Sequence, residues 1–89
     1  MDRIEKIRHR IINQLDAIDV VIRDDSHLHA GHAGAASGGG HFAVKIISDK
    51  FIGHSLIERH RLVYGALDDL MPNDIHALSI ETYTSEEQK

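Results

Sequence analysis

Histidine is the residue type with the widest chemical scope in this chain of 89 residues, which holds eight histidines and no cysteine. Four of the eight lie in the segment SHLHAGHAGAASGGGHF, residues 26–42, together with five of the seven glycines. Neutral imidazole is a good ligand for zinc, iron, copper and nickel. The spacing His27-x-His29-x-x-His32 is therefore a candidate metal-binding motif.

Three histidines at this spacing do not by themselves make a zinc site. Zinc sites normally use three or four fixed ligands, whereas these histidines lie in a glycine-rich segment with a permissive backbone. The segment also lacks the Lys and the Ser or Thr that complete a phosphate-binding loop. Its G-x-x-G, from Gly31 to Gly34, is the backbone clamp of RNA-binding KH domains, but it lies between two predicted strands instead of two helices.

A further histidine, His60, lies within a predicted helix. At 100° per residue it falls in the middle of an apolar stripe. That stripe comprises Leu56, Ile57, Val63, Tyr64, Leu67, Leu70 and Met71. The pattern favours a core histidine with one satisfied hydrogen bond. A metal ligand held rigidly on a helix is the other interpretation.

The length and composition of the chain argue against several classes of protein. The length indicates one domain, and the formal net charge of −4 disfavours a nucleic-acid binder, which usually carries a basic surface. The absence of cysteine excludes disulfides and a thiolate nucleophile. No apolar run approaches the ~18 residues of a membrane span, and no secretory signal opens the chain. We expect a cytoplasmic or organelle-matrix protein that is not an enzyme, with no membrane contact and no small-molecule substrate.

Hydrophobic periodicity predicts five regular elements in the order α-β-β-α-β. Asp2 is expected to cap the first helix, and Ser55 with Glu58 forms a capping box that opens the second. Pro72 and Asn73 are expected to end the second helix. The predicted elements are a helix over residues 4–15, strands over 17–24 and 42–48, a helix over 55–70 and a strand over 75–83. Residues 25–40 are expected to form a flexible loop, and residues 85–89 a polar tail that is frayed or forms a short helical turn.

This order predicts a two-layer α+β domain that spans residues 1–89. The first two strands are expected to pair antiparallel, and the second helix to cross over to a parallel third strand. The result is a three-stranded mixed sheet with both helices on one face. Alternation in the third strand is expected to place His76 and Thr82 on the same face as Leu78 and Ile80.

Several segments together resemble the BolA family: DDSHLHAGH, GGGHF, FIGHSLIERHRLVYGAL and IHALSIETYT. The similarity covers about residues 15–84. The F-x-G-x-S-x-x-x-R-H-R block with H-A-L-S-I-x-T-Y-T is its most specific part. The resemblance implies a class II KH-like fold, which agrees with the order of elements predicted from periodicity.

The resemblance also implies a function. BolA-like proteins pair with monothiol glutaredoxins and share a [2Fe–2S] cluster, for which glutaredoxin and glutathione supply thiolates. The histidine of the R-H-R block, His60 here, is implied as one ligand. The loop between the first two strands supplies another, and because this chain has no cysteine it resembles the His-type branch. In that branch the ligand precedes the H-F pair by nine residues, which selects His32, with His29 as the fallback. The isolated protein is expected to hold no cluster.

Some bacterial BolA-like proteins instead act as DNA-binding regulators of morphology and stress genes. Under that alternative, the candidate DNA contacts are Arg59, Arg61, Lys45 and Lys50. The net charge and the G-x-x-G missing before the second helix both disfavour it.

Overall fold

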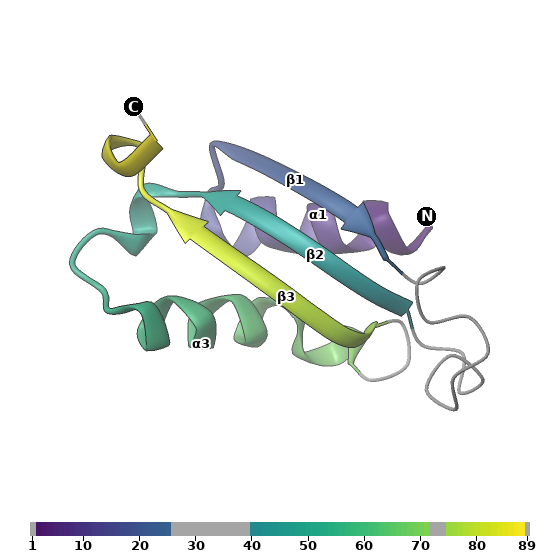
Figure 1. Ribbon diagram of the computed structural model, residues 1–89. Coiled ribbons are helices and arrows are strands. Elements are labelled where there is room, and N and C mark those ends of the chain that lie inside the picture. Colours follow the sequence, from purple (N-terminus) through teal and green to yellow (C-terminus); the bar gives the residue numbers. More distant parts are fainter. Residues whose placement is uncertain (1, 26–39, 72–74, 89) are drawn as a thin grey trace.

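The computed structural model describes residues 2–25, 40–71 and 75–88 (Figure 1). The predicted order α-β-β-α-β is confirmed, and the described residues also include three short 3₁₀ turns between or after the main elements. The elements are α1 (Arg3–Leu15), β1 (Asp19–Asp24), β2 (Gly40–Ile47), the turn η2 (Asp49–Phe51), α3 (Leu56–Leu67), the turn η3 (Asp68–Leu70), β3 (Ile75–Tyr83) and the turn η4 (Glu86–Gln88). No helix in these ranges combines the length and apolar character that crossing a membrane requires.

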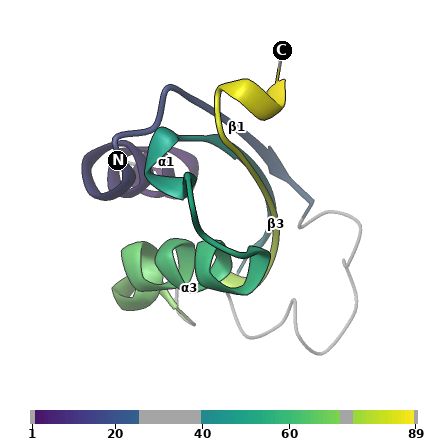
Figure 2. The same cartoon turned by 90° about the vertical axis from the view of Figure 1, so that its left-hand side faces the viewer.

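The three strands form one mixed sheet with β2 in the centre. β1 pairs antiparallel with β2, and β3 pairs parallel with β2 on the other side. α1 and α3 cover the same face of the sheet and contact each other, as the end-on view shows (Figure 2). The predicted two-layer α+β domain is therefore confirmed, and none of the described helices covers the other face of the sheet, which we call the bare face.

α1 forms where its sequence predicts. The Asp2 side chain accepts a hydrogen bond from the Glu5 amide at 2.9 Å, which satisfies one of the free amides of the first turn. Its buried residues, Ile7, Ile11 and Leu15, follow the helical repeat. The Leu15 carbonyl at the end of the helix accepts a hydrogen bond from the buried Ser48 hydroxyl, which ties α1 to the end of β2.

The strands supply the other half of the core. Val20, Phe42, Val44 and Ile46 are buried beneath the sheet, where they meet the helices. The first residues of β1 and β2 differ from the predicted ones. β1 begins at Asp19 and leaves Ile18 exposed, whereas β2 begins two residues early, at Gly40.

A bulge at the start of β3 changes which side chains face inward. Gly40 pairs with Ile75 but His41 pairs with Ala77, so two steps along β3 match one step along β2. Such a bulge reverses the side-chain alternation at that point. Ile75 is buried, whereas His76 is exposed. The prediction that His76 shares the inner face of Leu78 and Ile80 is therefore wrong.

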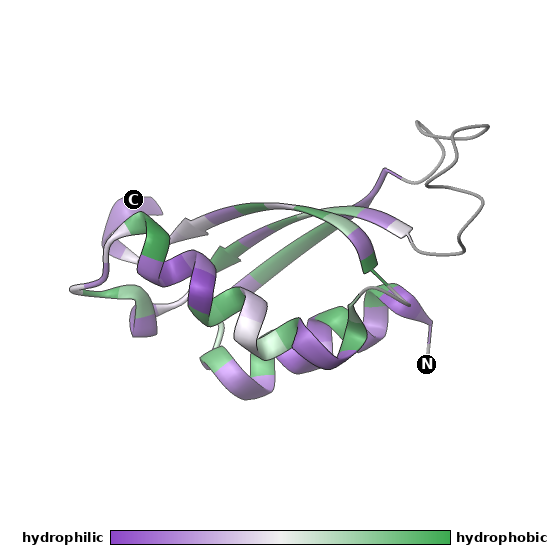
Figure 3. Ribbon diagram, turned by 90° about the horizontal axis from the view of Figure 1, so that it is seen from below, coloured by the Kyte–Doolittle hydropathy of each residue, from purple (hydrophilic) through white to green (hydrophobic). Residues whose placement is uncertain are grey.

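α3 is shorter than predicted and buries only part of the predicted stripe. It ends at Leu67 and continues as the turn η3 to Leu70. Its buried face comprises Val63, Ala66, Leu67 and Leu70. Leu56, Ile57 and Tyr64, all placed by the sequence on the buried stripe, are 63%, 64% and 40% exposed. Hydrophobic stretches lie at both ends of α3 and a hydrophilic one lies between them (Figure 3), but only the second half of the helix is packed into the core.

Candidate functional site

His60 lies on the second turn of α3 and is half-buried. The prediction that it occupies the middle of the buried stripe is wrong. Helical geometry explains its place: it precedes Val63 by three residues and Tyr64 by four, and Val63 is fully buried whereas Tyr64 is exposed. His60 therefore lies at the border between the buried face and an exposed apolar surface, which we name the α3 apolar surface and define as Leu56, Ile57 and Tyr64.

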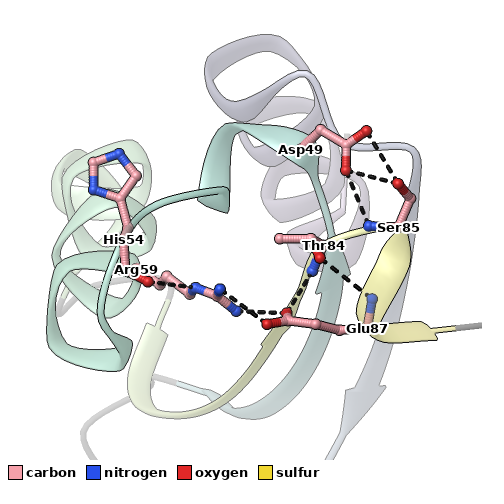
Figure 4. Close-up of polar contacts among 6 residues, drawn as sticks. All are labelled: Asp49, His54, Arg59, Thr84, Ser85 and Glu87. Carbon is pink, nitrogen blue, oxygen red and sulfur yellow. Dashed lines mark hydrogen bonds and ion pairs between the residues drawn. The ribbon is translucent and has the colours of Figure 1, made fainter.

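Arg59 occupies the core-facing position that precedes Val63 by four residues and Ala66 by seven. Its side chain is only 13% exposed. The Nη1 and Nη2 atoms donate to the two carboxylate oxygens of Glu87, at 2.7 and 3.1 Å, and Nε donates to the His54 carbonyl at 3.1 Å (Figure 4). The guanidinium carbon also lies 5.8 Å from the ring centroid of Phe51. One side chain thus joins α3, the loop before it and the C-terminal turn.

Glu87 is held ready for this contact. Its Oε1 atom also accepts from the Thr84 amide at 2.8 Å, and its own amide donates to the Thr84 hydroxyl at 3.3 Å. The Arg59 guanidinium, followed by the Thr84 amide, lowers the pKa of Glu87 to about 2. The carboxylate is therefore ionised throughout the physiological pH range.

A second acid anchors the same turn. Asp49, in η2, accepts from the Ser85 amide at 3.0 Å and from the Ser85 hydroxyl at 2.8 Å (Figure 4). These hydrogen bonds lower the pKa of Asp49. Of the two forms predicted for the tail, residues 86–88 take the short helical turn. Ser85 joins this turn to η2, and Glu87, within the turn, joins it to α3.

The predicted capping box at the start of α3 is confirmed. The Ser55 hydroxyl accepts from the Glu58 amide at 3.2 Å, and the Glu58 carboxylate accepts from the Ser55 amide at 2.8 Å. The bond from the Ser55 amide lowers the pKa of Glu58. These two hydrogen bonds fix where α3 begins, and they do not depend on apolar packing.

The candidate DNA contacts do not share a surface. Lys45 projects from the bare face of the sheet, 5.5 Å from the Tyr83 ring centroid, whereas both helices cover the opposite face. Lys50 lies 3.4 Å from the Asp16 carboxylate, and Arg59 is engaged by Glu87. Arg61 is exposed on α3. The structure thus separates residues that the alternative would need together.

The loop histidines His27, His29 and His32 lie outside the described residues, so the assignment of His32, with His29 as its fallback, stays a prediction. The structure does fix the two anchors of that segment. The Asp25 amide donates to the His41 carbonyl at 2.7 Å, at the end of the sheet where β3 begins (Figure 1). Beside this anchor, the rings of His41 and His76 lie 5.3 Å apart between centroids.

Within the described ranges, no group of three or more His, Asp or Glu side chains is arranged to hold a metal ion. His60 nevertheless has properties that suit a ligand contributed to a shared centre: an imidazole, a rigid helical position and partial exposure. Sequence reasoning found His60 but missed Glu87, His54 and Phe51 as neighbours of its helix. No local signal in the sequence links Arg59 to Glu87, because 28 residues separate them.

The family model described as BolA-like protein matches residues 11–87 of this chain. The chain belongs to the BolA family. The chloroplastic protein BOLA1 of Arabidopsis thaliana is 40% identical over 97% of the chain and 56% of its own length. The DNA-binding transcriptional regulator BolA of Escherichia coli is 32% identical over 93% of the chain and 76% of its own length.

A multidomain relative shows the same unit. The chloroplastic and mitochondrial SufE-like protein 1 of Arabidopsis thaliana is 40% identical over 92% of the chain but only 24% of its own length. The solved BolA domain of that protein superposes with a TM-score of 0.80, covering 93% of this chain and 92% of that structure. This BolA-like chain therefore spans about a quarter to a half of the length of these two plant relatives. Because the names of both plant relatives state organelles, the cytoplasmic location expected here stays a prediction.

Proposed function

We propose that this BolA-like protein binds a monothiol glutaredoxin and contributes histidine ligands to a [2Fe–2S] cluster that the two proteins share with glutathione. His60 gives one ligand, and His32, with His29 as fallback, gives the second. The complex acts in iron–sulfur cluster trafficking or in iron and redox regulation. When bound, the cluster supplies redox chemistry and labile iron; this chain supplies imidazole ligands and a docking surface.

The observation that carries the proposal is the setting of His60. The imidazole borders the α3 apolar surface, formed by Leu56, Ile57 and Tyr64, on a helix whose start is fixed by a capping box. Exposed apolar groups gathered around one polar group are typical of a protein-binding surface. A ligand placed there can reach a metal centre presented by a docked partner.

The metal-binding side chains of this chain favour a cluster shared with a partner over a cluster that this chain holds alone. The chain has no cysteine, and its described residues contain no group of three or more metal-binding side chains. Thiolates are the usual ligands of [2Fe–2S] clusters, and histidine pairs replace them on one iron in Rieske centres. A partner that brings thiolates completes what this chain lacks.

The loop can reach a cluster at some distance from its anchors. His32 is seven residues from Asp25, and an extended chain spans at most about 3.3–3.6 Å per residue. The reach is therefore on the order of 20 Å. His60, on a helix, then sets one coordination position, and a ligand within that reach supplies the second.

Mixing the protein with a monothiol glutaredoxin, glutathione and reconstituted cluster tests the proposal by visible absorption and circular dichroism. We expect a spectrum different from that of glutaredoxin alone, altered by His60→Ala and by His32→Ala. The matched control His27→Ala should leave it unchanged. A glutaredoxin spectrum that this protein does not perturb would overturn the shared cluster, and equal effects of His27→Ala and His32→Ala would overturn the choice of loop ligand.

The second candidate function is DNA binding, favoured by the name of the Escherichia coli relative. The net charge of −4 and the separation of Lys45 from the α3 residues disfavour it here. Titration of duplex DNA at two salt concentrations distinguishes the two functions. Tight binding that weakens steeply with salt would favour the regulator.

A further inference from the structure

The first half of α3, residues 56–62, carries the candidate ligand but has no apolar residue in the core. Leu56 and Ile57 are more than 60% exposed, and the first fully buried residue of the helix is Val63. Hydrophobic burial therefore does not hold these turns against the sheet. Isolated short helices are marginal in water, so another interaction must fix the position of His60.

Arg59, on the core-facing side of these turns, reaches the described residues of other elements at hydrogen-bonding distance. Its guanidinium makes the bidentate pair with Glu87 and donates to the His54 carbonyl. Bidentate arginine–carboxylate pairs are geometrically specific and stronger than neutral hydrogen bonds. The guanidinium carbon lies 5.8 Å from the ring centroid of Phe51, which is fully buried and so links the contact to the core.

The Glu87 carboxylate, which accepts these hydrogen bonds, is held in place as well as the Arg59 guanidinium that donates them. Glu87 is held by Thr84, which is 5% exposed and follows β3, and Ser85 is held by Asp49. The C-terminal turn is thus a rigid part of the domain and not a loose tail. Figure 4 shows the whole chain of contacts from Asp49 through Ser85, Thr84 and Glu87 to Arg59.

We propose that Arg59 and Glu87 form a clamp that docks the first two turns of α3 against the end of the sheet, and that Arg59 is thereby a positioning residue for His60. The clamp takes the place of apolar packing. It leaves Leu56 and Ile57 free to face a partner while their helix stays docked. The idea that Arg59 positions a cluster ligand rests on the function proposed above. The idea that Arg59 and Glu87 dock α3 does not depend on that function.

Amide hydrogen exchange and NMR of the His60 imidazole test the clamp in the free protein. Glu87→Ala should speed exchange at residues 56–62 by about tenfold or more, because a charged hydrogen-bonded pair is lost from a helix with little other support. Arg59→Lys, which keeps the charge but not the bidentate geometry, should give a smaller increase. Both variants should shift the His60 resonances.

Asp69→Ala is the matched control. It removes the carboxylate of a different arginine–aspartate ion pair, between Arg10 of α1 and Asp69 of η3, away from the start of α3. It should leave exchange at residues 56–62 and the His60 resonances unchanged. Equal effects from Asp69→Ala and Glu87→Ala, or none from Glu87→Ala, would overturn the clamp.

The cluster spectrum with glutaredoxin separates the two proposals. Glu87→Ala should alter or weaken it, and Asp69→Ala should not. Faster exchange with an unchanged cluster spectrum would refute the positioning of His60 but keep the docking role. If the wild-type protein perturbs no cluster at all, the proposed function fails, whereas exchange and the His60 resonances still decide the clamp.

Discussion

The two halves of α3 are attached to the domain by different interactions, apolar packing in the second half and polar contacts in the first. The second half packs Val63, Ala66 and Leu67 into the core. The first half turns its apolar residues outward and is held by the capping box and by Arg59. A helix can therefore present an apolar surface to a partner without losing its own position, provided that a polar contact replaces the missing burial.

The largest effect should come from truncation in the second half. Leu67→Ala should lower the free energy of unfolding by about 2–5 kcal/mol, since it leaves a cavity in a fully buried site. Ile57→Ala, in the exposed first half, should change it by no more than about 0.5 kcal/mol. Urea denaturation of both variants measures the difference. Comparable losses would mean that the first half is packed as tightly as the second.

An intermediate effect is expected on partner binding. Ile57→Asp should weaken binding of a monothiol glutaredoxin by about tenfold or more, because a charge replaces an apolar contact at the centre of the α3 apolar surface. Ile18→Asp is the control, since Ile18 is as exposed but lies beside β1 at the other edge of the sheet. Calorimetric titration measures both. Equal weakening by both variants would argue against this surface.

The smallest effect should be a pH dependence of stability. The pKa of Glu87 is about 2 in the folded chain, below its ordinary value of 4.5. A carboxylate with a lowered pKa stabilises the folded state above its ordinary pKa, and that gain is lost as the pH falls toward the folded value. The stability difference between wild type and Glu87→Gln should be constant near neutral pH and should shrink between about pH 4.5 and 2. Denaturation series across that range measure it, and a difference independent of pH would contradict the ion pair.

Local signals predicted most of the fold. Asp2 and the Ser55–Glu58 box mark the starts of the two helices, and both caps form as predicted. These contacts join residues three apart, so sequence spacing alone specifies them. The repeat of Ile7, Ile11 and Leu15 likewise identified the buried face of α1.

Two errors of the prediction have one cause. The apolar stripe of α3 was read from periodicity, which does not show how much of a helix face other elements cover. Leu56 and Ile57 therefore seemed buried but are exposed. His76 was placed inward by strict alternation, which the bulge opposite Gly40 breaks. In both cases the position of a neighbouring element decides the outcome.

The sequence by itself determined the family, the order of elements and the helix caps, because each depends on residue types at short or fixed spacing. Only the tertiary structure decided that His60 borders an exposed apolar surface, and that Arg59 is engaged by Glu87 instead of being free for DNA. The pair joins residues 28 apart, and its geometry exists only once β3 has brought the C-terminal turn beside α3.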